Sequence, residues 1–342
     1  MGKFGSLIAA AAIGVMAGTT AFAQDVTLRF QHFISPKGAV PAYFMAPWAE
    51  KIQNDSGGRI EVQLYPAMQL GGAPPALFDQ IRDNVIDGGW TIPGYTPGRF
   101  PGTEVFELPF IGSNNAEATS RAAYEFYEKY LGDEFSDVKI LAVHVHGPGA
   151  IHTKGVEIDS VDDFAGLKLR APTRLASQIL EKLGATPVGM PVPQLPEAIS
   201  KGVVDGGVIP FEIVPPLKIH ELATSHTIVG GDRALYNTVF IWAMNQSAYD
   251  RLPDDLKAVI DANSGPEAAA WAGRAMDTGD KPGLEATKKT GNAIHTLSDA
   301  EVAKMKELTQ PIIDAWIADM TEKGWPAEQM VQDARDLVAK YD

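Results

Sequence analysis

Apolar and polar residues follow two different periods in the first hundred residues of the chain. They alternate along Arg59–Tyr65 (RIEVQLY), as they do in a strand with one buried face. Pro74–Asn84 is instead amphipathic with the period of a helix and has a proline at its start. The pattern predicts the order strand, helix, strand, helix, strand, which implies parallel strands and right-handed crossovers: Val26–Gln31, Val40–Gln53, Arg59–Tyr65, Pro74–Asn84 and Asp87–Ile92.

The same order of elements recurs in the middle of the chain. In both copies the last strand follows an Asp-Gly-Gly turn, NVIDGGW at 84–90 and GVVDGGV at 202–208. Glycine allows the backbone to turn sharply after a helix and aspartate can hold such a turn, so we interpret Asp87 and Asp205 as structural. The elements of the second copy are Leu167–Arg170, Thr173–Leu183, Ala185–Val188, Pro193–Lys201 and Gly207–Ile209.

The remaining segments connect the two copies and extend beyond them. Ser136–His144, Ala150–Thr153 and Tyr236–Met244 are predicted strands. The last hundred residues are mostly helical, with caps such as Ser298 and Gly324 at the ends of one helix. We expect four helices there: Pro253–Asn263, Pro266–Thr278, Ser298–Lys323 and Pro326–Tyr341.

The first residues resemble a leader rather than part of a folded domain. Lys3 precedes a run of small and apolar residues that ends in Ala21-Phe22-Ala23, an A-x-A type cleavage site. We therefore expect residues 1–23 to be a secretory signal peptide. The alternative is a membrane anchor, but Gly14 and Gly18 interrupt the apolar run and leave it short for a bilayer span.

Composition and charge restrict the function. The chain has no cysteine, which excludes disulfides, zinc thiolates and a thiol nucleophile. Its formal charge of −14, or −15 once the single cation of the leader is removed, argues against nucleic acid and anionic lipid as partners. A mature chain of about 320 residues is long enough for two domains.

These observations predict an α/β fold with two lobes, each a mainly parallel sheet flanked by helices, and a long C-terminal helical region. Residues 24–147 and 236–275 would form lobe I, and 148–235 and 276–310 lobe II. Residues 311–342 would be helices that pack across both lobes. Ligands of open parallel sheets bind beyond the carboxyl ends of the strands, so an exported protein of this form is expected to close on a ligand between its lobes.

No enzyme, cofactor or metal motif is present in the sequence. It lacks G-x-S-x-G, H-E-x-x-H, a Walker loop and G-x-G-x-x-G after a strand. His144 and His146 share one face of a predicted strand but lack a third ligand nearby, so a hydrogen-bonded pair is favoured over a metal site. We expect no enzymatic activity, cofactor or metal. A periplasmic α/β hydrolase or lyase remains an alternative.

Arg170 is the most informative single residue. It ends a predicted strand just before Ala171-Pro172, where strand ends of this architecture face the cleft. A guanidinium at that place can hold a carboxylate through two parallel hydrogen bonds. The alternative is a surface arginine paired with Asp162 or Asp163.

The segment VDDFAGLKLRAP at 161–172 resembles the signature of the solute-binding proteins of tripartite ATP-independent periplasmic (TRAP) transporters. The stretch SGGRIEVQLYPAMQLG at 56–71 and both Asp-Gly-Gly turns are also similar to that family, and the likeness covers essentially the whole mature chain. It implies a monomeric periplasmic protein that captures a small organic acid. The acid is delivered to a permease of one small and one large membrane subunit. A binding protein of an ATP-driven transporter is an alternative with the same architecture.

The resemblance also implies a binding site. Arg170 would bind the substrate carboxylate and Asn237, in YNTVF, would line the pocket beside it. The other wall positions are His32, Phe33, Trp90, Pro210, Phe211 and Glu212.

Two departures from the family pattern bear on the ligand. A second arginine of some members is absent near Ala150, and the residues after the second Asp-Gly-Gly turn are apolar. Trp90 and Phe211 would then form an aromatic wall, unless they belong to the core as we expect of Phe240 and Trp242. Such a wall favours an aromatic or apolar monocarboxylate, with a sulfonium or betaine-type zwitterion as the alternative.

Glu212 has several possible roles. An acidic residue at this point assists a metal site in a related subgroup, and it could also neutralise a cationic ligand group. It could instead pair with Lys218, a role without ligand contact, which we favour because an unpaired buried carboxylate is costly.

Overall fold

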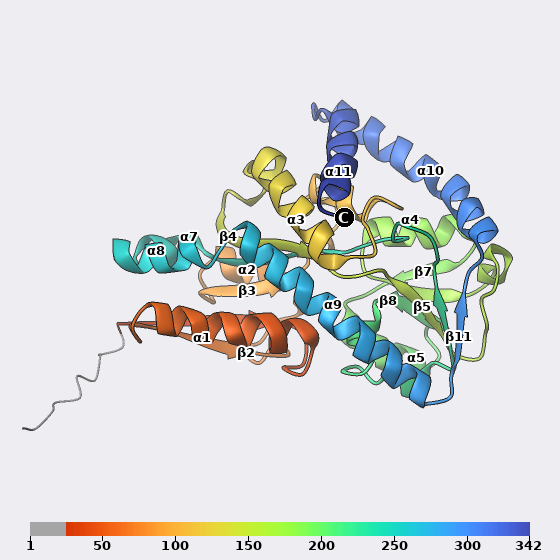
Figure 1. Cartoon of the computed structure of the whole chain (residues 1–342), viewed down its shortest axis with the longest axis horizontal. Helices are drawn as coiled ribbons and strands as arrows, with labels where there is room; N and C mark the ends of the chain where they lie inside the picture. The colour runs from red at the N-terminus through yellow and green to blue at the C-terminus, as the bar shows by residue number, and fades with distance from the viewer. Residues whose placement is uncertain (1–24) are drawn as a thin grey trace, which may run out of the picture.

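The computed structural model describes residues 25–342, so the predicted signal peptide, residues 1–23, lies outside the described residues. Two sheets with helices on their faces make up the molecule (Figure 1). This is the predicted two-lobed α/β fold, and we call the lobes that hold the two sheets lobe I and lobe II. Both sheets are mixed, and that of lobe I is not mainly parallel, in contrast to the prediction.

The sheet of lobe I has the strand order β2-β1-β3-β10-β4. β1 is parallel to both β2 and β3, whereas β10 is antiparallel to β3 and β4. Helices α1 (Ala46–Asp55) and α2 (Leu77–Arg82) connect the first three strands, and α3 (Ala116–Phe126) packs on β4. The strands are β1 (Val26–His32), β2 (Ile60–Tyr65), β3 (Gly88–Thr91), β4 (Val138–Val145) and β10 (Val239–Asn245).

The sheet of lobe II has the strand order β11-β9-β5-β8-β6-β7. β6 is parallel to β7 and β8, whereas β5 is antiparallel to β8 and β9. The strands are β5 (Ala150–Thr153), β6 (Lys168–Ala171), β7 (Thr186–Gly189), β8 (Gly206–Ile209), β9 (Ser225–Ile228) and β11 (Ala293–Thr296). The helices between them are α4 (Arg174–Lys182), α5 (Leu195–Ser200) and α6 (Ile219–Leu222).

The repeated unit predicted from the sequence is confirmed, and both copies are built alike. Each places its first strand between its second and third, as β2-β1-β3 and β7-β6-β8. The carboxylate of Asp87 accepts a hydrogen bond of 2.9 Å from the backbone N–H of Arg29 on β1. The carboxylate of Asp205 accepts one of 2.8 Å from the backbone N–H of Lys168 on β6. Both aspartates therefore join the third strand of a unit to its first, as their structural interpretation requires.

Helix α9 (Pro266–Lys289) connects the lobes and is longer than predicted. Figure 1 shows it running past both sheets, from the side of β4 to the side of β5 and β8. The sequence Gly279-Asp280-Lys281-Pro282-Gly283 suggested that the helix ends at Thr278, but the helix continues through it. A Cβ atom at Gly283 would lie 2.0 Å from the backbone oxygen of Phe211, so the missing side chain lets lobe II pack closely against the helix.

The C-terminal region is helical as predicted, with α7 (Gln246–Asp250), α8 (Asp254–Ala262), α10 (Asp299–Glu322) and α11 (Ala327–Tyr341). The predicted domain boundaries 275/276 and 310/311 fall inside the continuous helices α9 and α10. The division of the chain into two discontinuous lobes and a C-terminal part stays a prediction. None of the helices within residues 25–342 has the length and apolar character needed to span a bilayer.

Candidate functional site

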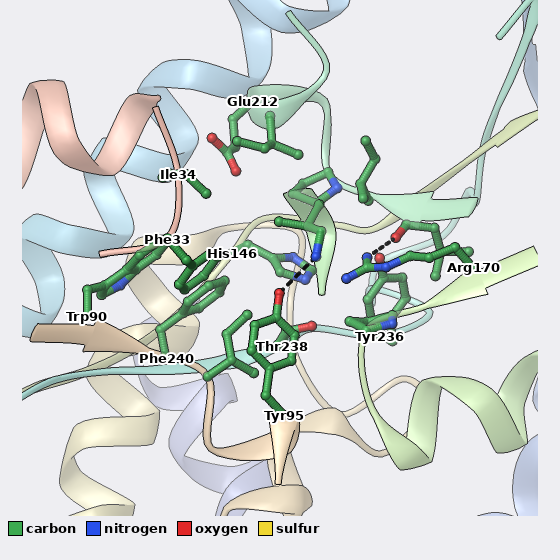
Figure 2. A pocket seen from close by; sticks show the side chains of 17 residues that line it. Phe33, Ile34, Trp90, Tyr95, His146, Arg170, Glu212, Tyr236, Thr238 and Phe240 are labelled. Atoms are coloured by element: carbon green, nitrogen blue, oxygen red, sulfur yellow. Dashed lines mark hydrogen bonds between the residues drawn. The ribbon is translucent and has the colours of Figure 1, made fainter. Parts of the chain in front are cut away.

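A cavity lies between the two lobes and encloses about 400 Å³, including its opening to solvent. Lobe I supplies residues that follow β1 and β3, and lobe II supplies the ends of β6 and β8 and the segment after β8. The segment 236–240, which leads back from lobe II into β10, completes the wall (Figure 2). The cavity therefore sits beyond the carboxyl ends of the parallel strands, as the architecture predicts.

Arg170 provides the cation of this cavity. Its side chain is only 2% exposed; Nε donates to the oxygen of Met190 at 2.9 Å and Nη1 to that of Val208 at 3.1 Å. The remaining nitrogen, Nη2, is buried without a hydrogen-bond partner, and no carboxylate within residues 25–342 forms an ion pair with this guanidinium. Burial lowers the pKa of Arg170. A buried guanidinium is costly without an anionic partner, so the geometry favours an anion at Nη2.

The alternative partners of Arg170 are engaged elsewhere. Asp162 forms an ion pair with Lys304 at 2.7 Å. Asp163 accepts hydrogen bonds from the backbone and hydroxyl of Ser160. The interpretation of Arg170 as a surface arginine paired with either aspartate is therefore wrong.

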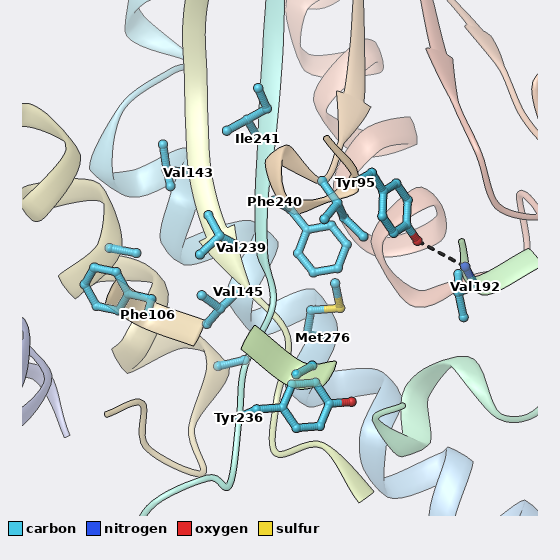
Figure 3. Close-up of a cluster of buried hydrophobic side chains, with 14 of the residues drawn as sticks. Tyr95, Phe106, Val143, Val145, Val192, Tyr236, Val239, Phe240, Ile241 and Met276 are labelled. Carbon is cyan, nitrogen blue, oxygen red and sulfur yellow. Dashed lines mark hydrogen bonds between the residues drawn. The ribbon is translucent and has the colours of Figure 1, made fainter. Parts of the chain in front are cut away.

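Three hydroxyl groups accompany Arg170, and none of them was predicted from the sequence. Tyr95, Tyr236 and Thr238 line the cavity, and the hydroxyls of Tyr236 and Thr238 are buried without a partner. The Tyr95 hydroxyl accepts a hydrogen bond of 3.1 Å from the backbone N–H of Val192 (Figure 3). Burial raises the pKa of both tyrosines, so their hydroxyls stay protonated and can donate to an anion.

Asn237 lies between two of these residues but is not among those that line the cavity. Its Nδ2 donates to the backbone oxygens of His146 at 2.7 Å and Gly147 at 3.3 Å. Neighbouring side chains of an extended segment point to opposite sides. Because Tyr236 and Thr238 face the cavity, Asn237 holds the backbone behind it. The alternation within YNTVF was the signal that could have identified the two hydroxyls.

Aromatic rings form the wall away from Arg170. The ring of Trp90 stacks on that of Phe33, with centroids 4.8 Å apart and an angle of 7°, and on that of Phe240 at 4.6 Å and 4°. All three residues line the cavity. Trp242 is a core residue as predicted and packs against Phe30 and Trp48. Phe240 is also buried in the core as expected, and its ring contributes to the wall of the cavity as well.

Three buried histidines lie in or next to this aromatic wall. The indole Nε1 of Trp90 donates to Nε2 of His144 at 2.8 Å, so His144 fixes the orientation of the indole. Burial lowers the pKa of His144 to about 3 and those of His146 and His32 to about 4, which keeps all three rings neutral near pH 7. His146 lines the cavity, whereas His32 is buried outside its wall. His144 and His146 both form hydrogen bonds, as favoured from the sequence, but with Trp90 and with the oxygen of Gly147 rather than with each other.

Most residues at the end of β8 and directly after it line the cavity. Pro210 and Glu212 line the cavity, but Phe211 between them packs against His152 with centroids 5.1 Å apart. Lys218, a suggested partner of Glu212, pairs with Glu221 at 3.8 Å. Of the eight predicted site residues the structure therefore brings five together, Arg170, Trp90, Phe33, Pro210 and Glu212. It places Asn237, Phe211 and His32 outside the cavity wall, and ligand contact by any of the eight stays a prediction.

The chain is similar to a known family of proteins and to several solved structures. The model of the bacterial extracellular solute-binding protein family 7 (DctP) matches residues 30–319. A TRAP solute-binding protein from Rhodoferax ferrireducens T118, solved with copurified benzoate, is 46% identical and has a TM-score of 0.90, covering 92% of this chain and 98% of that one.

Two further solved structures are similar. One is a marine metagenome TRAP solute-binding protein specific for aromatic acid ligands, solved with 3-hydroxybenzoate; it is 46% identical, covers 93% of this chain and 99% of that one, and has a TM-score of 0.91. The other, a TRAP periplasmic solute-binding protein from Bordetella bronchiseptica with bound (R)- and (S)-mandelate, is 30% identical. It covers 93% of this chain and 100% of that one, with a TM-score of 0.86.

Proposed function

Because this chain belongs to the bacterial extracellular solute-binding protein family 7, the family of TRAP solute-binding proteins, we propose that it captures a small aromatic monocarboxylate between its lobes. The protein then presents this ligand to a TRAP permease with a small and a large membrane subunit. It acts in the periplasm as a monomer and catalyses no reaction.

The unpaired Nη2 of Arg170 is the observation that carries the proposal. A ligand carboxylate at this atom supplies the charge that the buried guanidinium lacks, and the hydroxyls of Tyr236 and Tyr95 donate to it as well. In a site shielded from water these charge-assisted hydrogen bonds are stronger than in solution. Asn237 supports the site from behind, through the backbone of His146 and Gly147.

The aromatic wall supports a ring as the body of the ligand. Phe33, Trp90 and Phe240 offer stacked apolar surfaces, which suit an aromatic ring better than a polyhydroxylated chain. The similar proteins from Rhodoferax ferrireducens, the marine metagenome and Bordetella bronchiseptica were solved with benzoate, 3-hydroxybenzoate and mandelate. All three ligands are aromatic monocarboxylates. Nothing in the cavity or in these proteins supports a sulfonium or betaine-type ligand.

A binding role also agrees better with the cavity than catalysis does. Its polar side chains are those of an arginine, two tyrosines, a threonine, a histidine and a glutamate. Nδ1 of His146 lies 2.5 Å from the oxygen of Gly147, so this ring bonds to the backbone and not to a nucleophile. Catalysis by acyl transfer would need a nucleophile and a base in contact.

Calorimetry with benzoate tests the proposal. Replacing Arg170→Met is expected to weaken binding by about 2–5 kcal/mol, since the carboxylate then loses its cation in a buried site. Arg121→Met is the matched control, because Arg121 pairs with Glu117 and Glu267 on the outside of lobe I. Equal benzoate affinities of wild type and Arg170→Met would contradict the site. Binding of neutral sugars but no aromatic acid would contradict the function.

A further inference from the structure

We propose that Glu212 is a specificity-determining residue of the cavity and selects aromatic carboxylates that carry a hydrogen-bonding substituent, such as a hydroxyl group, on the ring. This inference rests on the proposed function and assigns a second polar contact to the same ligand. Arg170 would hold the carboxylate, and Glu212 would recognise the substituent.

Glu212 offers an unused polar atom to the cavity. The side chain lines the cavity and is 8% exposed, and its Oε2 is buried without a hydrogen-bond partner among residues 25–342. Figure 2 shows its carboxyl group beside Ile34, well separated from the guanidinium of Arg170. A ligand whose carboxylate is bound at Arg170 therefore meets Glu212 at another part of its surface.

Packing against α9 fixes the backbone and the Cβ atom of Glu212, from which this carboxyl group extends. The backbone N–H of Glu212 donates to Oδ1 of Asp280 at 2.8 Å. A Cβ atom at Gly279 would lie 2.8 Å from the Cβ of Glu212, and one at Gly283 would lie 2.0 Å from the oxygen of Phe211. The segment thus lies directly on the helix backbone. A side chain on a fixed backbone segment loses less freedom on binding than one on a mobile segment.

The charge around Glu212 suits a neutral polar substituent. Burial raises the pKa of Glu212 to about 8, and the charge of Asp280 acts in the same direction. The carboxyl group is therefore mostly protonated near pH 7 and can both donate and accept a hydrogen bond. Within residues 25–342 it forms no ion pair with lysine or arginine. A hydroxyl group satisfies Oε2, whereas a methyl group of similar size leaves it unpaired.

Calorimetry with five acids tests the inference: benzoate, 3-hydroxybenzoate, 3-methylbenzoate, 4-hydroxybenzoate and 4-methylbenzoate. Wild type is expected to bind at least one hydroxybenzoate about tenfold more tightly than the methylbenzoate with the same substitution pattern. Glu212→Leu is expected to remove this preference while benzoate affinity changes less than about threefold. Glu212→Gln keeps a neutral donor and acceptor and is expected to retain most of the preference. Glu134→Leu is the matched control, since Glu134 also has a buried, unpaired Oε2 but lies in lobe I away from the cavity.

The outcomes separate this inference from the proposed function. Binding of benzoate without any preference of wild type for a hydroxyl group would overturn the role of Glu212 alone. The same conclusion would follow if Glu212→Leu kept the preference. Failure of wild type to bind every one of these acids would overturn the proposed function as well. The comparison of ligands on wild type needs no variant, so the absence of a preference overturns the inference even if Glu212→Leu does not fold.

Discussion

The hydroxyl of Tyr95 accepts a hydrogen bond of 3.1 Å from the backbone N–H of Val192, and this contact joins lobe I to lobe II beside Arg170. Arg174 of α4 and Glu104 of lobe I form an ion pair that also joins the lobes. The residues that we expect to bind the carboxylate therefore lie next to contacts that hold the lobes together. We therefore expect ligand binding and closure of the lobes to be coupled through Tyr95.

Tyr95→Phe is expected to weaken benzoate binding by about 1–2 kcal/mol. The substitution leaves the N–H of Val192 without its partner and removes a donor next to Arg170. Calorimetry measures the change in affinity. Tyr249→Phe serves as the control, because that hydroxyl donates to Asp261 on the surface of lobe I and is remote from the cavity. Unchanged affinity in Tyr95→Phe would contradict the coupling.

Asp87→Ala and Asp205→Ala are each expected to lower the free energy of unfolding by about 1–3 kcal/mol without changing benzoate affinity. Each substitution leaves a backbone N–H of a first strand, that of Arg29 or Lys168, without its acceptor. Urea unfolding and calorimetry separate the two effects. Asparagine at either position keeps an acceptor for this N–H and should lower the free energy of unfolding less than alanine does. A loss of binding at full stability would show that these aspartates have a functional role.

Gly283→Ala is expected to destabilise the protein by about 1–3 kcal/mol, although alanine normally stabilises a helix relative to glycine. The added Cβ would lie 2.0 Å from the backbone oxygen of Phe211 and force α9 away from the segment that carries Glu212. Gly132→Ala is the control, since its Cβ would meet no atom within 4 Å. Urea unfolding measures both variants. Stabilisation by Gly283→Ala would mean that α9 does not pack on this segment as described.

Stability is expected to fall between pH 6.5 and about 8. Four buried carboxyl groups have pKa values raised by burial, to about 8 for Glu107 and Glu212 and about 7 for Glu134 and Asp280. At a pH between their unfolded and folded pKa values, these groups hold their protons only in the folded state. Their contribution to stability is therefore complete below the unfolded pKa of about 4.5 and is lost as the pH rises through the folded pKa values.

Buried histidines have the opposite effect on stability and lower the free energy of unfolding at low pH. Their pKa values are lowered by burial to about 3 or 4. As the pH is lowered below 6.5, the unfolded state therefore takes up protons that the folded state does not, and the free energy of unfolding decreases. These residues are His32, His144, His146, His152 and His226. Urea unfolding across this range should show highest stability between about pH 4.5 and 6.5, where the two groups oppose each other. Constant stability from pH 6.5 to 8 would contradict the burial of these carboxyl groups, and Glu107→Gln should reduce the loss in that range.

The sequence was sufficient for the fold and for part of the site. Both repeated units, their Asp-Gly-Gly turns and Arg170 at a strand end were predicted from local patterns. Such patterns are readable because a strand or helix that buries one face repeats its apolar residues with a fixed period. The position of Arg170 follows from the order of the elements, since parallel strands bring their carboxyl ends to one edge.

The direction of individual side chains, and the end of α9, were decided by the tertiary structure. In YNTVF, alternation means that only every second residue faces the cavity, and only the packed lobes decide which. They also decide which residues after β8 line it. Tyr236, Thr238 and Glu212 face it, whereas Asn237 and Phe211 do not. The sequence Gly-Asp-Lys-Pro-Gly has the propensity of a turn, but contacts of Gly283 and Asp280 with lobe II keep it helical. Local sequence determines the period of each helix and strand. Contacts between distant residues determine which face is buried, and where a segment adopts a structure other than the one that its own sequence favours.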